Sequence, residues 1–375
     1  MQTDGSSELL ASRLSRASLL FAGLLSLVAG IWVGLGRAGV PVPFSEPASF
    51  PLHGPLMVPG FLGTLIGLER AVGLRRAWCY ASPILSATGT MLLLAGAPVP
   101  WVAAVYTLAA IVLVATMVSL WVEYPAGYTL LLFLSALCLL AGNAVWVARL
   151  SPAPATGWWT LFLVGTIAAE RTQLSRVIRP PSWASPTLFL VLAIGVVSVA
   201  SGGFERPLAA LGLGVSLAAT AVWMARFDVA WRTLRHPGLP RFVAVGLLSG
   251  FAWLGVAGLI ASAYGLGLVA VVYDAVLHAV FLGFVFSMIF AHAPIIFLAI
   301  LRLRVPFHRL FYVHWAVLHI SVLLRISGDL AGSWFLRTWG ILGNALAIAL
   351  FLLVTTVQVL RAARSKPQSA LRAQA

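Results

Sequence analysis

Long apolar segments recur from one end of this chain to the other, and they constrain its fold more than any other feature. Between Ala17 and Leu360, stretches of roughly 20 residues with very few charges follow one another with only short connections. A helix of that length crosses about 30 Å of hydrocarbon, because each helical residue rises about 1.5 Å. The pattern therefore predicts an all-α protein, a polytopic transmembrane helical bundle.

Twelve spans are predicted. They cover about residues 17–36, 52–72, 78–96, 100–122, 126–148, 157–178, 185–201, 207–225, 242–263, 269–292, 307–327 and 338–360. Residues 17–360 thus form one transmembrane domain, and residues 1–16 and 361–375 are predicted to be terminal tails. The apolar run from Leu268 to Leu301 is too long for one crossing, so we expect Pro294 to break or kink it.

The distribution of basic residues predicts the orientation of the chain. It contains 24 Lys and Arg residues against 10 Asp and Glu residues. With twelve spans, 19 of the basic residues fall on the side of the two termini, and the other five are Arg37, Arg149, Arg206, Arg325 and Arg337. Basic residues concentrate on the cytoplasmic side of membrane proteins. We therefore expect a multi-pass inner-membrane protein in contact with lipid, with both termini in the cytoplasm and no nucleic-acid partner.

Several functional classes are excluded by missing motifs. Cys79 and Cys138 are too few, and lie too deep in apolar sequence, for a disulfide framework or a thiolate metal site. No Walker-type phosphate loop, Ser-His-Asp order or HExxH motif occurs. Whether the protein is an enzyme stays undecided at this level.

Histidines are enriched in the apolar segments. Of the seven histidines, all except His236 fall in a predicted span or at the end of one. An imidazole in hydrocarbon costs free energy unless it is hydrogen-bonded, titrates or binds a metal. The candidate cofactor and metal ligands are His53, His278, His314 and His319. Counted along their helices, His53, His278 and His319 lie in the outer half of the membrane, and His314 lies nearer its middle.

The types of these side chains favour heme or copper. Met57 follows His53 by four residues and lies on the same helix face, and imidazole with thioether suits heme iron or copper. His314 and His319 are separated by about 140° around a helix, so they do not easily face one centre. Heme is therefore the expected cofactor and copper a second candidate. For Met57 alone, packing in the core remains the simpler interpretation.

Three motifs carry a family resemblance. They are HGPLMVPGFLGTLIGLERA from His53, VLHAVFLGFVFSMIFAHAP from Val276, and VLLRISGDL from Val322. Together they resemble NnrS-type proteins, twelve-span membrane proteins that are linked to nitric oxide stress and look like distant relatives of the catalytic subunit of heme–copper oxidases and nitric oxide reductases. The resemblance implies a heme–copper-oxidase-subunit-I-like arrangement of helices. It also implies heme, with copper as a further option, and nitric oxide or a related diatomic gas as ligand.

Individual positions match this family and others depart from it. The matching residues are His53, Met57, His278, Gly283, Met288 and the pair Leu324-Arg325. The family's second-span motif commonly has a second histidine and an acid where this chain has Pro55 and Leu56. The adjacent histidine pair that helps to hold copper in respiratory oxidases is also missing. Turnover at a two-metal centre is therefore not what the resemblance predicts for this chain.

Two other functions stay open. Glu69-Arg70 and Glu170-Arg171 lie near span ends predicted to be cytoplasmic, and Glu69 and Glu170 could form a proton route in a proton-coupled transporter that also uses the histidines. The alternative for both carboxylates is an interfacial ion pair with the neighbouring arginine. A third function is that of a scaffold, in which polar groups only fasten the helices together. The sequence does not identify an electron donor.

Overall fold

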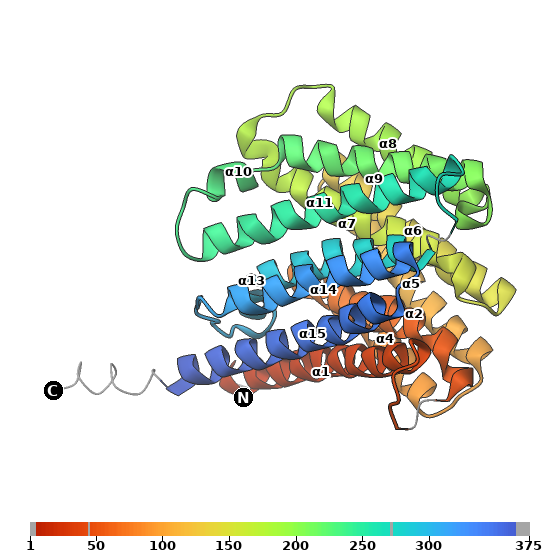
Figure 1. Ribbon diagram of the computed structural model, residues 1–375. Helices are drawn as coiled ribbons and strands as arrows, with labels where there is room; N and C mark the ends of the chain where they lie inside the picture. The colour runs from red at the N-terminus through yellow and green to blue at the C-terminus, as the bar shows by residue number, and fades with distance from the viewer. Residues whose placement is uncertain (1–4, 44–45, 271–272, 365–375) are drawn as a thin grey trace.

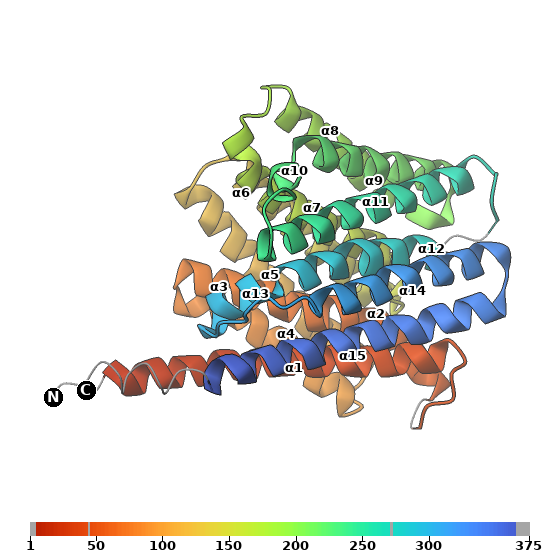
Figure 2. The same cartoon turned by 60° about the vertical axis from the view of Figure 1, so that its left-hand side comes forward.

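The chain folds into a bundle of helices. The computed structural model describes residues 5–43, 46–270 and 273–364, and within these ranges there are helices and turns but no strand. Figures 1 and 2 show the long helices lying side by side along one common direction, with only short connections at the two ends of the bundle. The all-α bundle predicted from the sequence is confirmed.

The long helices follow one another along the whole chain. They are α1 (Gly5–Arg37), α3 (Gly63–Leu74), α4 (Ala81–Leu94), α5 (Val99–Glu123), α6 (Gly127–Arg149), α7 (Thr156–Ser175), α8 (Ala184–Ala200), α9 (Pro207–Phe227), α11 (Leu239–Gly265), α13 (Ser287–Leu301), α14 (Phe311–Ala331) and α15 (Trp334–Arg364). Short helical segments connect or extend them. These are η1 (Pro47–Leu52), α2 (His53–Pro55), η3 (Ala77–Tyr80), η4 (Ala153–Ala155), η5 (Arg176–Ile178), η6 (Gly203–Glu205), α10 (Ala230–Thr233) and α12 (Tyr273–His278). Two further segments, η2 (Leu56–Leu62) and η7 (Ala279–Phe286), are π-helical.

Ten helices in the described ranges are long and apolar enough to cross a membrane. They are Leu14–Arg37, Pro47–Leu74, Ala77–Leu94, Val99–Glu123, Gly127–Arg149, Pro207–Phe227, Leu239–Gly265, Tyr273–Leu301, Phe311–Ala331 and Trp334–Ala362. Each of them overlaps one predicted span. The protein is therefore a multi-pass membrane protein.

The other two predicted spans coincide with α7 and α8, which fall short of the same requirements. Helix α8 is apolar but has 17 residues. Helix α7 contains several polar residues, and most of its side chains are buried against other helices rather than exposed. A helix that is covered by protein on all sides needs no continuous apolar surface facing lipid. This explains why the mean hydropathy of α7 is low. A total of twelve crossings stays a prediction.

The structure corrects one detail of the predicted spans and adds one at the N-terminus. The run that ends at Leu301 is not broken at Pro294, because the helix continues from Tyr273 to Leu301 with Pro294 inside α13. The departure from α-helical geometry lies upstream of the proline, in η7. At the N-terminus, α1 begins at Gly5, so much of the predicted tail is helical. Residues 1–4 and 365–375 of the predicted tails lie outside the described ranges.

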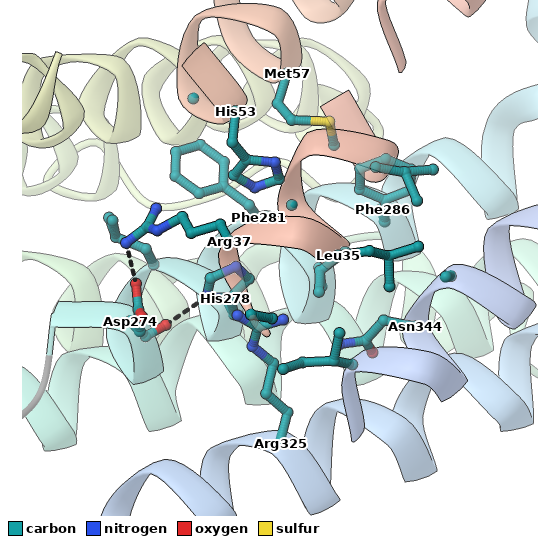
Figure 3. A pocket seen from close by; sticks show the side chains of 18 of the residues that line it. Leu35, Arg37, His53, Met57, Asp274, His278, Phe281, Phe286, Arg325 and Asn344 are labelled. Carbon is teal, nitrogen blue, oxygen red and sulfur yellow. Dashed lines mark hydrogen bonds and ion pairs between the residues drawn. The ribbon is translucent and has the colours of Figure 1, made fainter. Parts of the chain in front are cut away.

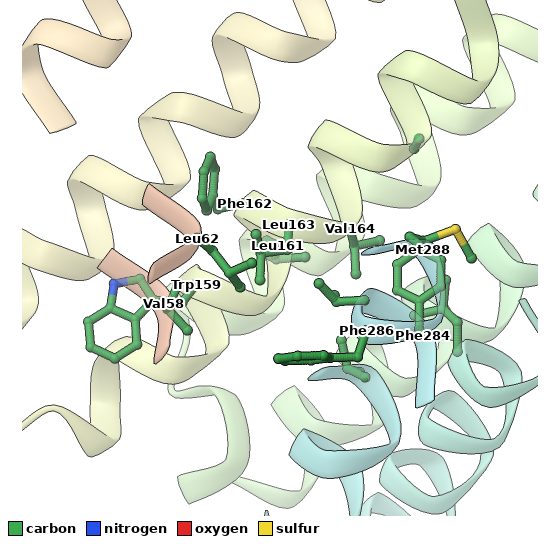
Figure 4. Close-up of a cluster of buried hydrophobic side chains, with 14 of the residues drawn as sticks. Val58, Leu62, Trp159, Leu161, Phe162, Leu163, Val164, Phe284, Phe286 and Met288 are labelled. Carbon is green, nitrogen blue, oxygen red and sulfur yellow. The ribbon is translucent and has the colours of Figure 1, made fainter. Parts of the chain in front are cut away.

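The π-helices and α7 meet in the centre of the bundle. Figure 4 shows apolar side chains from η2, α7 and η7 packed against one another, among them Leu62, Phe162 and Phe284. The start of α1 and the end of α15 lie at the same end of the bundle (Figures 1 and 2). This arrangement requires an even number of crossings. The side chains described next lie at the opposite end, beside the last turn of α1.

Candidate functional site

A cavity beside the last turn of α1 brings together three of the predicted ligands. His53, Met57 and His278 line it, with charged side chains from α1, α12, α14 and α15. About 1100 Å³ between its lining atoms is free of protein, its opening to the surface included. Figure 3 shows the two imidazoles entering from different helices. Residues 225 positions apart in the chain thus share one site.

The two imidazole rings lie close together and nearly parallel. The ring centroids of His53 and His278 are 6.4 Å apart, and the ring planes differ by 22°. Both rings are partly buried, and each side chain belongs to a helix of the bundle rather than to a loop. Helical positions hold side chains more precisely than loops do. The pair is therefore a rigid element of the fold.

Backbone carbonyls fix the orientation of both rings. His53 Nδ1 lies 2.7 Å from the carbonyl oxygen of Gly30 on α1, and His278 Nδ1 lies 2.6 Å from that of Asp274. Because a carbonyl oxygen only accepts hydrogen bonds, the Nδ1 atom must donate in each case. In the neutral imidazole this leaves an unprotonated Nε2, and among the described residues neither Nε2 has a hydrogen-bond partner. Metal-binding histidines are commonly held by this type of contact.

Glycines on α1 make space for the side chains of α2 and η2. A Cβ atom at Gly34 would lie 2.8 Å from two atoms of the His53 ring, and one at Gly30 would lie 2.7 Å from the sulfur of Met57. Both distances are well below van der Waals contact. Glycine at these two positions lets α1 approach α2 and η2 closely without displacing the His53 ring or the Met57 side chain, and this approach brings the Gly30 carbonyl to His53.

A π-helix follows each histidine of the pair. The segment η2 begins three residues after His53, and η7 begins directly after His278. π-Helical turns are rare and occur frequently at functional sites. In η2, the carbonyl oxygen of Leu56 accepts a hydrogen bond of 2.8 Å from Ser26 Oγ on α1. A side chain of another helix thus supplies a hydrogen bond where the local backbone departs from the α-helical pattern.

Arginines dominate the charge of the cavity. Arg37, Arg325 and Arg337 line it with one carboxylate, Asp274. Asp274 forms ion pairs with Arg37 (3.2 Å) and Arg337 (3.4 Å), and Arg337 also lies 3.2 Å from Asp329. In Figure 3, Arg325 points toward His278. Its Nε atom is buried without a hydrogen-bond partner among the described residues, which is costly for a charged group.

His319 lies elsewhere and has both ring nitrogens engaged. Trp253 Nε1 donates a hydrogen bond of 2.8 Å to His319 Nδ1, so in the neutral ring Nε2 carries the proton. Nε2 lies 3.1 Å from Ser249 Oγ and 3.3 Å from Ser287 Oγ. The ring does not line the cavity. In this arrangement His319 offers no free lone pair to a metal.

His314 is also separate from the cavity and is surrounded by aromatic rings. The side chain is buried, and its ring centroid lies 4.9 Å from that of Phe290 and 5.5 Å from that of Phe351. Neither ring nitrogen has a hydrogen-bond partner among the described residues. The structure thus joins His53, His278 and Met57, and it joins neither His314 nor His319 to them.

Glu69 and Glu170 lie in a network of ion pairs at the other end of the bundle. Arg70 donates a hydrogen bond to Glu170 on α7 and lies 3.9 Å from Glu69. Arg171 does not pair with Glu170 and instead binds Asp228 with distances of 2.6 and 3.0 Å. The Arg70–Glu170 contact links α3 to α7 and the Arg171–Asp228 contact links α7 to the residue after α9, whereas Glu69 lies beside its sequence neighbour Arg70. These contacts favour a structural role for Glu170 over that of a free carboxylate on a proton route.

The part of the chain that the structure describes contains no cluster of Asp, Glu, Cys and His side chains that could hold a metal ion without further ligands. No group of three or more such residues in the described ranges is placed to hold a metal ion. The cavity offers two imidazoles and a thioether instead. The two imidazoles are strong ligands, and they suit a metal ion whose remaining ligands belong to its own prosthetic group.

Comparison with known proteins identifies a family. No curated protein matches the chain. A family model matches residues 16–360, a region that contains the whole cavity and the ion-pair network at the other end. The chain belongs to the family that this model describes as a domain of unknown function, DUF8744.

Proposed function

We propose that this membrane protein binds heme, with His53 and His278 as the two axial ligands of the iron. The observation that carries the proposal is the pair of nearly parallel imidazoles, each with Nδ1 held by a backbone carbonyl and with Nε2 free. Four of the six positions around a heme iron are filled by the macrocycle. Two imidazoles are therefore a complete protein contribution to such a site.

The distance between the rings favours two ligands on opposite sides of one metal ion. With metal–nitrogen bonds of about 2.0 Å, two imidazole centroids on opposite sides lie about 6.3 Å apart, whereas at a tetrahedral or trigonal ion they lie about 5.2–5.5 Å apart. The observed separation is 6.4 Å. This separation is the one expected for two ligands of a heme iron, and it is longer than a tetrahedral or trigonal copper site with His53, His278 and Met57 would give.

The arginines fit the rest of the cofactor. Heme carries two carboxylates, and Arg325 offers a buried Nε without a partner among the described residues. Charge-assisted hydrogen bonds between guanidinium and carboxylate are among the stronger polar contacts in proteins. Arg37 and Arg337 share Asp274 and retain further donors. These three side chains would hold the carboxylates, and the apolar lining would hold the macrocycle.

This ligation points to electron transfer or heme handling rather than turnover. Heme with two imidazole ligands supplies one-electron chemistry and no vacant coordination position. The residues of this chain would keep both rings neutral and oriented, and they would limit water at the iron. Nitric oxide could compete for the iron only where one histidine is displaced. The proposal also includes twelve membrane crossings and a helix arrangement like that of subunit I of heme–copper oxidases. It includes cytoplasmic termini as well, and with this orientation the cavity lies in the outer half of the membrane.

Heme and metal content of the purified protein tests this function. After expression with a supplied heme precursor, we expect close to one heme per chain in a pyridine hemochrome assay, with a Soret band and reduced-minus-oxidised difference bands. Metal analysis by mass spectrometry should detect iron without stoichiometric copper. Absence of a Soret band would contradict the proposal. Proton flux through metal-free protein in liposomes would favour the transporter instead.

A further inference from the structure

A second hollow, far from the histidine cavity, lies among the start of α1, the end of α3, the η3–α4 segment and the end of α13. These segments meet at the end of the bundle where α1 begins (Figure 2). Three arginines line this groove, Arg16, Arg75 and Arg302, and none of its lining residues is acidic. The groove therefore has a net positive charge at a place where transmembrane helices end.

None of these three arginines has an acidic partner among the described residues. Arg16 Nε donates a hydrogen bond of 3.1 Å to the hydroxyl of Tyr80, which also lines the groove. Among the described residues, the side chains of Arg75 and Arg302 form no ion pair or hydrogen bond. The neighbouring Arg76, which does not line the groove, is paired with Glu123 at 2.8 Å. The arginines of the groove thus remain available to an anion.

The backbone at Arg75 and Arg302 is unusual. Both residues adopt left-handed conformations, with φ of 56° and 55°, and each ends a helix. Glycine takes this conformation at much lower cost than residues with a Cβ atom. The same conformation occurs at Leu150 and Arg179, which lie outside the groove, so it marks where these helices end and does not itself indicate a ligand.

The groove also has an apolar wall. Ile84 and Leu298 line it and are 49% and 48% exposed. An inorganic anion would use the arginines and leave this wall uncovered, whereas a phospholipid carries a phosphate and acyl chains on one molecule. We propose that the groove binds an anionic phospholipid, with its phosphate among Arg16, Arg75 and Arg302 and an acyl chain along Ile84 and Leu298. Basic pockets between transmembrane helices are known to bind lipid headgroups of this type.

Native mass spectrometry of the full-length protein with added lipid tests this site. We expect phosphatidylglycerol to bind in preference to phosphatidylcholine. The triple variant Arg16→Gln, Arg75→Gln, Arg302→Gln should bind phosphatidylglycerol about 100-fold more weakly, from the typical contribution of one basic residue near a charged lipid surface. The matched control Arg179→Gln, Arg232→Gln, Arg235→Gln removes the same charge elsewhere, including at Arg179, which also has a positive φ. It should bind within about twofold of the unchanged protein.

Three outcomes would overturn the proposal. They are equal binding of the two lipids, equal loss of binding in the control, and displacement of the lipid by millimolar inorganic phosphate, which would make the site one for free phosphate. Thermal unfolding in detergent, followed by tryptophan fluorescence, checks that each variant is folded. If the triple variant does not fold, the single change Arg302→Gln replaces it, with an expected loss of about fivefold.

Discussion

His278→Ala and His53→Ala are each expected to remove most of the heme from the purified protein. Each change deletes one of the two imidazoles whose ring centroids lie 6.4 Å apart. Changes outside the coordination shell already cost about 10- to 100-fold in metal affinity, so loss of a ligand should cost at least that much. The measurement is heme per chain in a pyridine hemochrome assay, with the absorption spectrum of any heme that remains.

Two other histidines serve as controls for this experiment. His314→Ala and His319→Ala change imidazoles that do not line the cavity, and both variants should retain heme with an unchanged spectrum. Full heme content and an unchanged spectrum in both His53→Ala and His278→Ala would show that the cofactor, if present, is held elsewhere. Loss of heme in all four variants would indicate general unfolding, which a thermal unfolding curve distinguishes.

Asp228→Ala is expected to destabilise the protein by about 3–5 kcal/mol, the usual cost of leaving one partner of a buried ion pair alone. The side chains of Arg171 and Asp228 are 6% and 1% exposed, and two hydrogen bonds join them. Asp228 Oδ1 also accepts a hydrogen bond of 2.7 Å from the backbone N–H of Ala230. The free energy of unfolding in mixed micelles, titrated with a denaturing detergent, measures this effect.

Two comparisons separate this cost from a general effect of charge removal. Arg76→Ala breaks the exposed pair with Glu123, whose side chains are 44% and 40% exposed, and should cost less than about 1 kcal/mol. The double change Arg171→Met, Asp228→Leu removes both buried charges and should recover most of the stability. A cost below about 1 kcal/mol for Asp228→Ala would contradict the view that this pair clamps α7 to the segment after α9.

The helical bundle could be predicted from the sequence because the membrane interior imposes one simple rule on the backbone. Backbone groups in hydrocarbon must be hydrogen-bonded within the segment, so long apolar runs become helices. The ten qualifying helices all coincide with predicted spans. The position of α7 was also predicted, although its burial against other helices was not. Hydropathy reflects how much of a helix faces lipid. It therefore predicts membrane-spanning helices less well when other helices cover them.

Part of the candidate site could also be predicted from the sequence. Depth along the second and tenth predicted spans places His53 and His278 at similar levels, and the structure brings these rings together. The same depth argument included His319, which instead bonds to Trp253, Ser249 and Ser287. Depth along a helix says nothing about direction around the bundle axis, and the neighbours of each helix were unknown.

Arg37 and Arg337 were missed as site residues, and Arg325 was noted only as a match to the family motif, although a signal for all three was present. Arg37, Arg325 and Arg337 are three of the five basic residues on the side opposite the termini, against the prevailing distribution of charge. The positive-inside rule does not account for basic residues on the side opposite the termini. Such residues therefore point to a function other than setting the orientation of the chain. The π-helices η2 and η7 had no comparable signal. They depend on tertiary contacts such as the hydrogen bond from Ser26 to the Leu56 carbonyl.

Electron paramagnetic resonance of the oxidised, heme-loaded protein at low temperature tests the central claim most directly. Two imidazole ligands from His53 and His278 predict a low-spin ferric signal, because both axial positions are then filled by strong-field nitrogen ligands. Ring planes that differ by 22° further predict a rhombic form of that signal. A high-spin signal, which one imidazole or none would give, would contradict the ligation that we propose, and a protein that takes up no heme would contradict the function.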